Sequence, residues 1–194
     1  FEHASIDEAY LDVTEATGAD WDKALALCEG LQREIVDATG LTASFGLGPT
    51  RLLAKMSSEE RKPQGLFRLM PGDASAFFEG RSLREIPGIG PATATTMQEW
   101  GVQTVDEAYG LGELALARMV GPRFAAWLMA VVEERTSDDV SVLRSRKSIG
   151  KETTFERDQH DEEQVLEHLL TLVERVMERA TELGVVGRLG EVKL

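Results

Sequence analysis

Two adjacent carboxylates near the start of the chain, Asp7 and Glu8, are the residues best suited to hold a metal ion. β-Prone residues alternate on both sides of them, at Ala4, Ile6, Tyr10, Leu11 and Val13. This pattern predicts two short strands of a hairpin with the acids at the crossing point, where a turn lets both face one cation. Mg²⁺ prefers such oxygen ligands and keeps waters and substrate phosphates in its other positions. An acidic turn can also be purely structural, so the pair alone leaves both interpretations open.

Basic residues in two places are candidates for binding phosphate, and a third basic residue precedes a proline. Arg51 and Lys55 are four residues apart in a predicted helix and share one face, although an ordinary solvated basic face is the alternative. Lys62 precedes Pro63, which favours an extended backbone over the end of a helix. The best candidate for a DNA phosphate track is a run that contains no acid: Arg144, Arg146, Lys147 and Lys151.

The segment 83–102 has the pattern of a helix-hairpin-helix element. Gly88, Ile89 and Gly90 permit a tight turn, and Pro91 suits the first turn of a following helix. The exposed N–H groups of that turn would bind a nucleic-acid phosphate without reading its sequence. A structural pair of helices is the alternative here.

Composition limits the classes of protein that fit. The 194 residues carry a formal charge of −13, which argues against a general nucleic-acid binder unless the contacts are local. The single cysteine, Cys28, fits a reducing compartment such as the cytoplasm and excludes an intrachain disulfide. No apolar run reaches the length of a membrane span. The chain begins within a strand motif without Met and ends within an apparent strand, so we expect an excised piece of a longer polypeptide.

Periodicity and capping signals predict most of the elements. Asp20 and Gly40 should bound a helix over 21–39, and Thr50 should cap a helix that begins at Arg51. The predicted strands are 41–46, 66–69, 148–157 and 185–194, and an amphipathic helix with an apolar face inside is predicted over 161–183. The segment Val120–Ala125 is a weak second hairpin or a plain helix junction, and His160 and His168 should be surface residues.

Several of these motifs occur together in one known family. The segment Ser5–Asp12, Ser-Ile-Asp-Glu-Ala-Tyr-Leu-Asp, resembles the second palm motif of the Y-family, or translesion, DNA polymerases, and is most like the DNA polymerase IV branch. Five further segments resemble later motifs of the family in the same order. Gly40–Gly48 resembles its next strand, Thr50–Met56 its next helix and Lys62–Gly65 its Lys-Pro-x-Gly turn. Ile86–Gly90 resembles its thumb hairpin and Arg146–Gly150 the start of its little finger.

The resemblance implies an α+β fold in three parts. Residues 1–72 would be the C-terminal part of a polymerase palm, made of the β-hairpin, helices and a mixed sheet. Residues 73–135 would be an all-α thumb with the helix-hairpin-helix, 136–147 a linker, and 148–194 the N-terminal part of an α+β little-finger domain. The fingers and the first palm motif would lie upstream of Phe1.

The resemblance also assigns roles to residues. Asp7 would bind both of two Mg²⁺ ions, Glu8 the ion at the primer terminus, and a third carboxylate would come from the upstream motif, while Ser5 would shape the hairpin. Lys62 would hold the triphosphate of a deoxynucleoside triphosphate, with support from Lys55. Primer-template DNA would contact Gly88, Ile89, Gly90, Arg144, Arg146, Lys147, Ser148 and Lys151. A sliding clamp is a further candidate partner, and no membrane is expected.

The expected function is therefore low-fidelity, template-directed synthesis past damaged DNA by the parent protein, with this piece alone inactive. A non-catalytic DNA-binding or adaptor module that uses the helix-hairpin-helix is the main alternative, and nucleotide incorporation separates the two. A nucleotidyl cyclase also pairs acids on a palm, but it gives the thumb-like hairpin no role.

Overall fold

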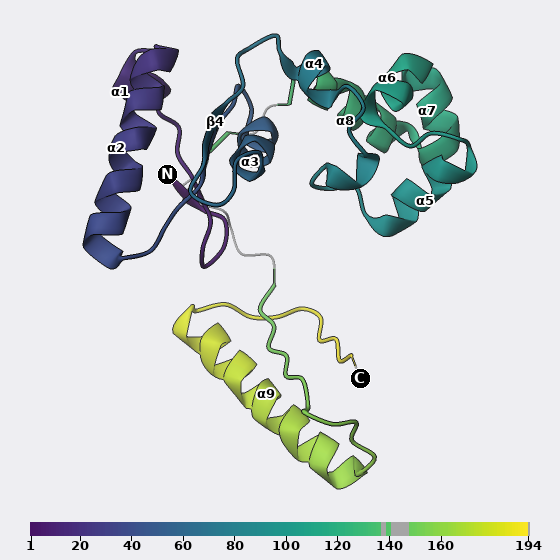
Figure 1. Ribbon diagram of the computed structural model, residues 1–194. Helices are drawn as coiled ribbons and strands as arrows, with labels where there is room; N and C mark the ends of the chain where they lie inside the picture. The colour runs from purple at the N-terminus through teal and green to yellow at the C-terminus, as the bar shows by residue number, and fades with distance from the viewer. Residues whose placement is uncertain (137–138, 141–147, 194) are drawn as a thin grey trace. The chain divides into compact units, whose positions relative to one another are not determined.

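The structure is a computed structural model that describes residues 1–136, 139–140 and 148–193. It divides into two units, Phe1–Val142 and Leu143–Leu194 (Figure 1). This division falls inside the segment 136–147 that was expected to be a linker. The first unit is not divided further, although a boundary between palm and thumb was expected near residue 72.

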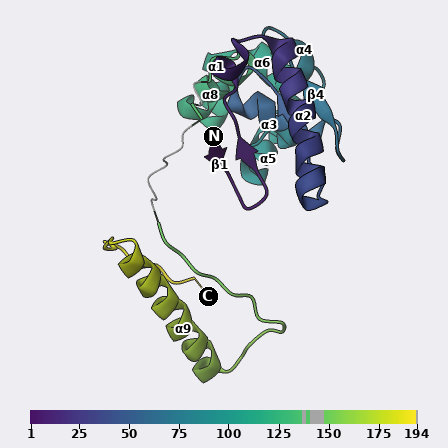
Figure 2. The same cartoon turned by 90° about the vertical axis from the view of Figure 1, so that its left-hand side faces the viewer.

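The chain opens with the predicted hairpin. β1 (Glu2–His3) pairs antiparallel with β2 (Ala9–Tyr10), and Glu2 lies opposite Tyr10. The loop is closed by the N–H groups of Ala4 and Ser5, which donate to the Glu8 carbonyl over 2.9 and 3.2 Å. Asp7 and Glu8 therefore lie in the loop, as predicted. Figure 2 shows β1 beside the N-terminus of the chain. The predicted strand around Ile6 is wrong, because this residue is in the loop and fully exposed at 105%.

Two helices follow the hairpin. α1 (Thr14–Thr17) was not predicted, whereas α2 (Trp21–Thr39) has the predicted bounds. The Asp20 carboxylate caps α2 by accepting from the N–H groups of its first turn, and Gly40 ends it at a φ of 70°. Cys28 is buried on the inner face of α2, as expected for a core cysteine.

A parallel pair of strands lies beside these helices. β3 (Phe45–Leu47) pairs with β4 (Leu66–Arg68), with Phe45 opposite Leu66. β3 begins later than predicted because only residues facing β4 form a ladder, and Leu41 is 69% exposed. Within the described residues, the hairpin and this pair are separate two-stranded sheets, one antiparallel and one parallel, so the mixed sheet expected for the palm is not formed.

α3 (Arg51–Glu59) connects β3 to β4 and packs closely on β3. The Thr50 hydroxyl accepts from the Leu53 N–H over 3.3 Å and caps the helix, as predicted. The backbones approach so closely that a Cβ atom on Gly46 would lie 2.1 Å from the Ala54 carbonyl oxygen. The glycine in β3 therefore sets the distance between this strand and the helix that carries Arg51 and Lys55.

The remaining described elements of the first unit are helices and one 3₁₀ turn. They are α4 (Ala74–Phe78), a 3₁₀ turn η1 (Leu83–Glu85), α5 (Pro91–Glu99), α6 (Val105–Leu111), α7 (Glu113–Val120) and α8 (Pro122–Val132). Leu53 and Met56 of α3 belong to the same buried core as Phe78, Met97 and Leu128 of these helices. Gly121 and Pro122 join α7 directly to α8.

The second unit holds one long helix, α9 (Glu162–Glu182), capped by Asp161. None of its residues is buried, so the predicted inner position of its apolar face is wrong: Leu166, Leu170, Val173 and Met177 are 55, 57, 44 and 60% exposed. The strands predicted over 148–157 and 185–194 are also wrong for the described residues 148–193. A strand needs a hydrogen-bonded partner, and these segments do not pair with each other. His160 and His168 are exposed, as predicted.

Candidate functional site

Two ion pairs fix the acidic hairpin on one face of α3. Arg51 donates to the buried Glu2 carboxylate over 2.9 Å and stacks 3.9 Å above the Tyr10 ring. One turn further along the helix, Lys55 Nζ lies 2.6 Å from Glu8 Oε1. The two basic residues therefore face the hairpin, and the alternative of a freely solvated basic face is wrong. Because Glu2 and Glu8 bracket the loop, this face of α3 sets the position of Asp7 as well.

A short hydrogen bond orients the Asp7 carboxylate. The Ser5 hydroxyl donates to Asp7 Oδ1 over 2.6 Å, and it also accepts from the Asp7 N–H over 3.4 Å. The Ser5 contact is the largest cause that lowers the pKa of Asp7, and the charges of Lys55 and Lys62 lower it further. An aspartate with its usual pKa of 3.8 is already ionised at neutral pH, and the Ser5 contact favours that charged form further.

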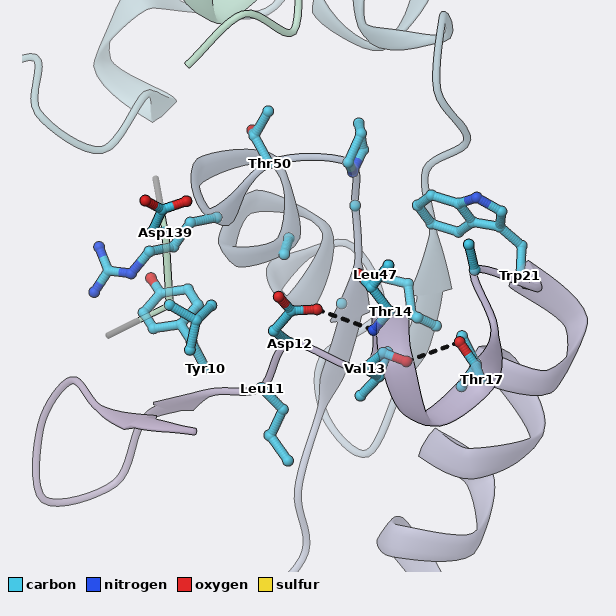
Figure 3. Close-up of a pocket in the computed structure, with 18 of the residues that line it drawn as sticks. Tyr10, Leu11, Asp12, Val13, Thr14, Thr17, Trp21, Leu47, Thr50 and Asp139 are labelled. Atoms are coloured by element: carbon cyan, nitrogen blue, oxygen red, sulfur yellow. Dashed lines mark hydrogen bonds between the residues drawn. The ribbon is translucent and has the colours of Figure 1, made fainter. Parts of the chain in front are cut away.

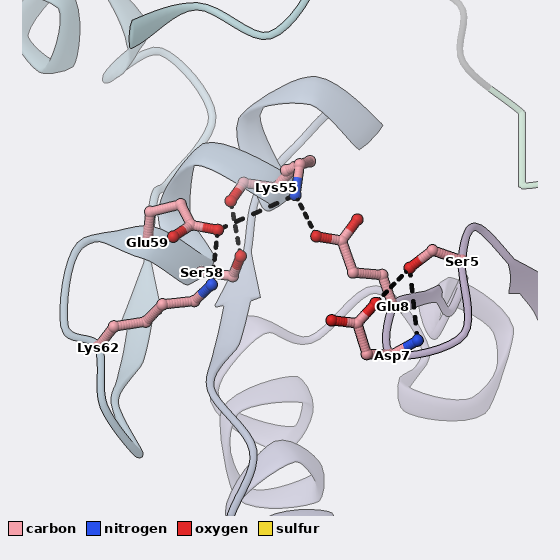
Figure 4. A network of polar contacts seen from close by, with 7 residues as sticks. All are labelled: Ser5, Asp7, Glu8, Lys55, Ser58, Glu59 and Lys62. Atoms are coloured by element: carbon pink, nitrogen blue, oxygen red, sulfur yellow. Dashed lines mark hydrogen bonds and ion pairs between the residues drawn. The ribbon is translucent and has the colours of Figure 1, made fainter. Parts of the chain in front are cut away.

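Four side chains of alternating charge connect the hairpin to the Lys-Pro-x-Gly turn (Figure 4). Lys55 Nζ lies 2.6 Å from Glu8 Oε1 and 3.9 Å from Glu59 Oε1, and the same Glu59 oxygen lies 2.8 Å from Lys62 Nζ. We call Glu8, Lys55, Glu59 and Lys62 the charge chain. The hydrogen bond to Glu8 is the largest cause that raises the pKa of Lys55 above its usual value of 10.5, and the charge of Glu59 raises it further.

Removal of the Ser5 hydroxyl should raise the pKa of Asp7. In Ser5→Ala the carboxylate loses its shortest hydrogen bond, so its pKa should move up toward the usual value of 3.8. A carboxylate with a lowered pKa stabilises the fold above its unfolded-state pKa and loses that contribution as the pH falls through its folded-state pKa. The measurement is an NMR titration of the Asp7 carboxyl carbon below pH 5, and Ser58→Ala is a control hydroxyl that bonds to a backbone carbonyl. If the pKa of Asp7 were the same in Ser5→Ala and in the parent chain, Ser5 would not be the residue that lowers it.

A cavity of about 430 Å³ lies beside this surface (Figure 3). β2, the starts of α1 and α2, the end of β3 and the start of α3 line it. Two of its polar side chains bond to nearby backbone: Asp12 accepts from the Thr14 N–H over 2.9 Å, and the Thr17 hydroxyl donates to the Val13 carbonyl over 2.8 Å. Asp7, Glu8, Lys55 and Lys62 do not line the cavity. The charged site is an open surface, which suits a polymeric substrate better than a small enclosed one.

The candidate DNA-binding residues fall into two groups. Gly88 adopts a φ of 103°, and Gly90 precedes Pro91, which takes the first position of α5 as predicted. Both glycines are exposed, whereas the Ile89 side chain is buried. The element before this turn is the 3₁₀ turn η1, so the first helix of the expected helix-hairpin-helix is only one turn long. In the basic run, Ser148 and Lys151 are exposed. Arg144, Arg146 and Lys147 lie outside the described residues.

The described residues alone do not form a complete metal centre. Among them, no three His, Cys, Asp or Glu side chains gather around one point. No helix in the described part of the chain is long and apolar enough to cross a membrane.

Comparisons with known proteins agree on one family. Two models described as the impB/mucB/samB family and its C-terminal domain match residues 1–59 and 146–194, together just over half of the chain. DNA polymerase IV of *Streptomyces coelicolor* is 36% identical over 96% of this chain and 39% of its own length. DNA polymerase IV of *Halorhodospira halophila* is 35% identical over 100% of this chain and 54% of its own length. The chain thus spans about half the length, or less, of these relatives.

Solved structures agree with the sequence relatives. A Y-family DNA polymerase chimera of Dbh and Dpo4 superposes with a TM-score of 0.79 at 29% identity, over 91% of this chain and 51% of the chimera. A DinB protein from *Sulfolobus solfataricus* superposes with a TM-score of 0.64 at 31% identity, over 72% of this chain and 41% of that protein. The mixture of helices and small sheets described above is therefore an arrangement that Y-family polymerases share.

Proposed function

Because the chain belongs to the impB/mucB/samB family, the Y-family DNA polymerases, we propose that it is the part of a translesion DNA polymerase that supplies two catalytic carboxylates. The observation that carries this proposal is the hairpin itself. Asp7 and Glu8 lie in one loop, and two ion pairs hold that loop on the helix that also leads to Lys62. Adjacent carboxylates beside fixed ammonium groups suit the transfer of a nucleotide from a triphosphate.

The residues present fit magnesium as part of a larger ligand set. Both side chains offer hard oxygen donors, and the bond from Ser5 favours the charged form of Asp7. Two Mg²⁺ ions would take Asp7 as a shared ligand and Glu8 as a ligand of the ion at the primer terminus. When bound, such ions lower the pKa of the attacking hydroxyl and offset the charge of the leaving pyrophosphate.

The other side chains of the surface position these groups. Ser5 holds Asp7 in one rotamer, and Lys55 holds Glu8 against α3 until a cation replaces it. Lys62 is 51% exposed on the same surface and would neutralise the triphosphate of an incoming deoxynucleotide. Its ammonium adds positive charge where the leaving group gains negative charge.

The remaining parts would hold DNA. We propose that 1–72 is the C-terminal part of the palm, 73–135 the thumb, 136–147 the linker and 148–194 the start of the little finger. The exposed backbone at Gly88 and Gly90 and the first turn of α5 would bind a DNA phosphate, since among the described residues no side chain caps this helix. The basic run from Arg144 to Lys151 would add a second phosphate contact.

A chimera tests the function directly. In the relative from Streptomyces coelicolor, we would replace the matching segment with this chain. Primer extension with Mg²⁺ would then be followed on an undamaged template and on a template with an abasic site. We expect the primer to be extended on both templates, and we expect chelation of Mg²⁺ to stop this extension. A folded chimera that binds primer-template without extending it would instead support a non-catalytic adaptor.

A further inference from the structure

Glu59 occupies the central place in the charge chain. Its Oε1 atom lies 2.8 Å from Lys62 Nζ and 3.9 Å from Lys55 Nζ, so one carboxylate oxygen faces both lysines. Lys55 in turn faces two carboxylates, with Glu8 the closer one at 2.6 Å. In this arrangement Lys62, the proposed ligand of the triphosphate, is held by a carboxylate of its own chain.

We propose that Glu59 is a positioning residue that couples the hairpin carboxylates to Lys62. This inference rests on the proposed function. A cation that neutralises Glu8 removes the closest partner of Lys55. The attraction of Lys55 then falls mainly on Glu59, and the added positive charge beside Glu59 weakens its hold on Lys62. Lys62 becomes available to a triphosphate when the hairpin is loaded, and it stays on Glu59 when the hairpin is empty.

The exposure of the pairs sets the size of the coupling. The Glu59 and Lys62 side chains are 50 and 51% exposed, so water screens their interaction. Lys55 is only 28% exposed, and its pair with Glu8 is correspondingly better shielded. Exposed pairs of this kind change an equilibrium constant by a small factor, about two- to fivefold. The coupling therefore tunes the order of binding and does not act as an all-or-none switch.

The test measures binding of inorganic tripolyphosphate to the chain itself in the presence of a chelator, by NMR of the lysine ε-methylene groups. Glu59→Gln should bind about two- to fivefold more tightly than the parent chain because Lys62 loses its competitor. Glu60→Gln is the matched control. It removes the same charge from the next residue, but the Glu60 carboxylate pairs with Arg81 at 2.7 Å, so its effect should be smaller.

A second pair of variants tests the connection through Lys55. Glu8→Gln imitates a neutralised hairpin and should raise the affinity for tripolyphosphate about twofold, and this gain should disappear when Lys55→Gln is added. The inference is overturned if Glu59→Gln has no larger effect than Glu60→Gln, or if the Glu8→Gln gain persists without Lys55. Lys62→Gln separates this result from the proposed function. Binding that does not depend on Lys62 in any variant removes the nucleotide-binding role of Lys62 as well.

Discussion

The double variant Asp7→Asn, Glu8→Gln should extend a primer at least about 10³-fold more slowly. The protein assayed is the chimera that carries this chain within the Streptomyces coelicolor relative. Metal ions contribute several kcal/mol to the stabilisation of a phosphoryl-transfer transition state, and each 1.36 kcal/mol corresponds to a factor of ten in rate. Both substitutions keep the shape of the side chain while they remove the charge that holds the ions. The measurement is single-turnover incorporation of one nucleotide.

The affinity for primer-template should change little in the same double variant. The proposed DNA contacts lie at Gly88–Gly90 and in the basic run, away from the hairpin in sequence, and removing two negative charges does not weaken phosphate binding. Glu29→Gln with Glu34→Gln is the matched control, because these exposed acids on α2 carry the same total charge. An extension rate equal in both double variants would show that Asp7 and Glu8 are structural.

Gly46→Ala should destabilise the chain by about 3 kcal/mol or more. The added Cβ would lie 2.1 Å from the Ala54 carbonyl oxygen and 2.2 Å from the Ser58 N–H nitrogen, and both of these are backbone atoms that cannot rotate away. Relief requires α3 to move off β3, which costs as much as severe overpacking of a core. This is a large share of the 5–15 kcal/mol by which domains are stable. Urea unfolding of the chain measures it.

A second glycine provides the control for this substitution. Gly30 lies within α2, and a Cβ there would meet no atom within 4 Å. Gly30→Ala should therefore raise the free energy of unfolding by up to about 1 kcal/mol through helix propensity. If the two variants unfolded at the same urea concentration, the close approach of α3 to β3 would be wrong, and so would the placement of Lys55 against the hairpin.

Local signals in the sequence predicted those elements that depend on neighbouring residues. The capping carboxylate of Asp20, the hydroxyl of Thr50 and the stop at Gly40 each act within one helical turn, and all three occur where they were predicted. The hairpin was predicted for the same reason, since its strands and loop lie within about ten residues. The family motifs were the basis for proposing which of these local elements carry chemistry.

Features that depend on distant partners were missed. The strands predicted over 148–157 and 185–194 have suitable residue types but no ladder partner among the described residues. The Glu8–Lys55 pair joins residues 47 positions apart, and only the packing of the hairpin on α3 brings them together. Glu59 had a visible signal, four residues after Lys55 and three before Lys62, but helix spacing alone does not distinguish it from an ordinary surface pair.

A crystal structure of the chimera with primer-template DNA, a non-hydrolysable deoxynucleoside triphosphate and Mn²⁺ would test the central claim most directly. We predict anomalous density within about 2.5 Å of a carboxylate oxygen of both Asp7 and Glu8, with Lys62 released from Glu59 onto the triphosphate. The account would be contradicted by metal bound elsewhere while Glu8 stays on Lys55 and Asp7 on Ser5.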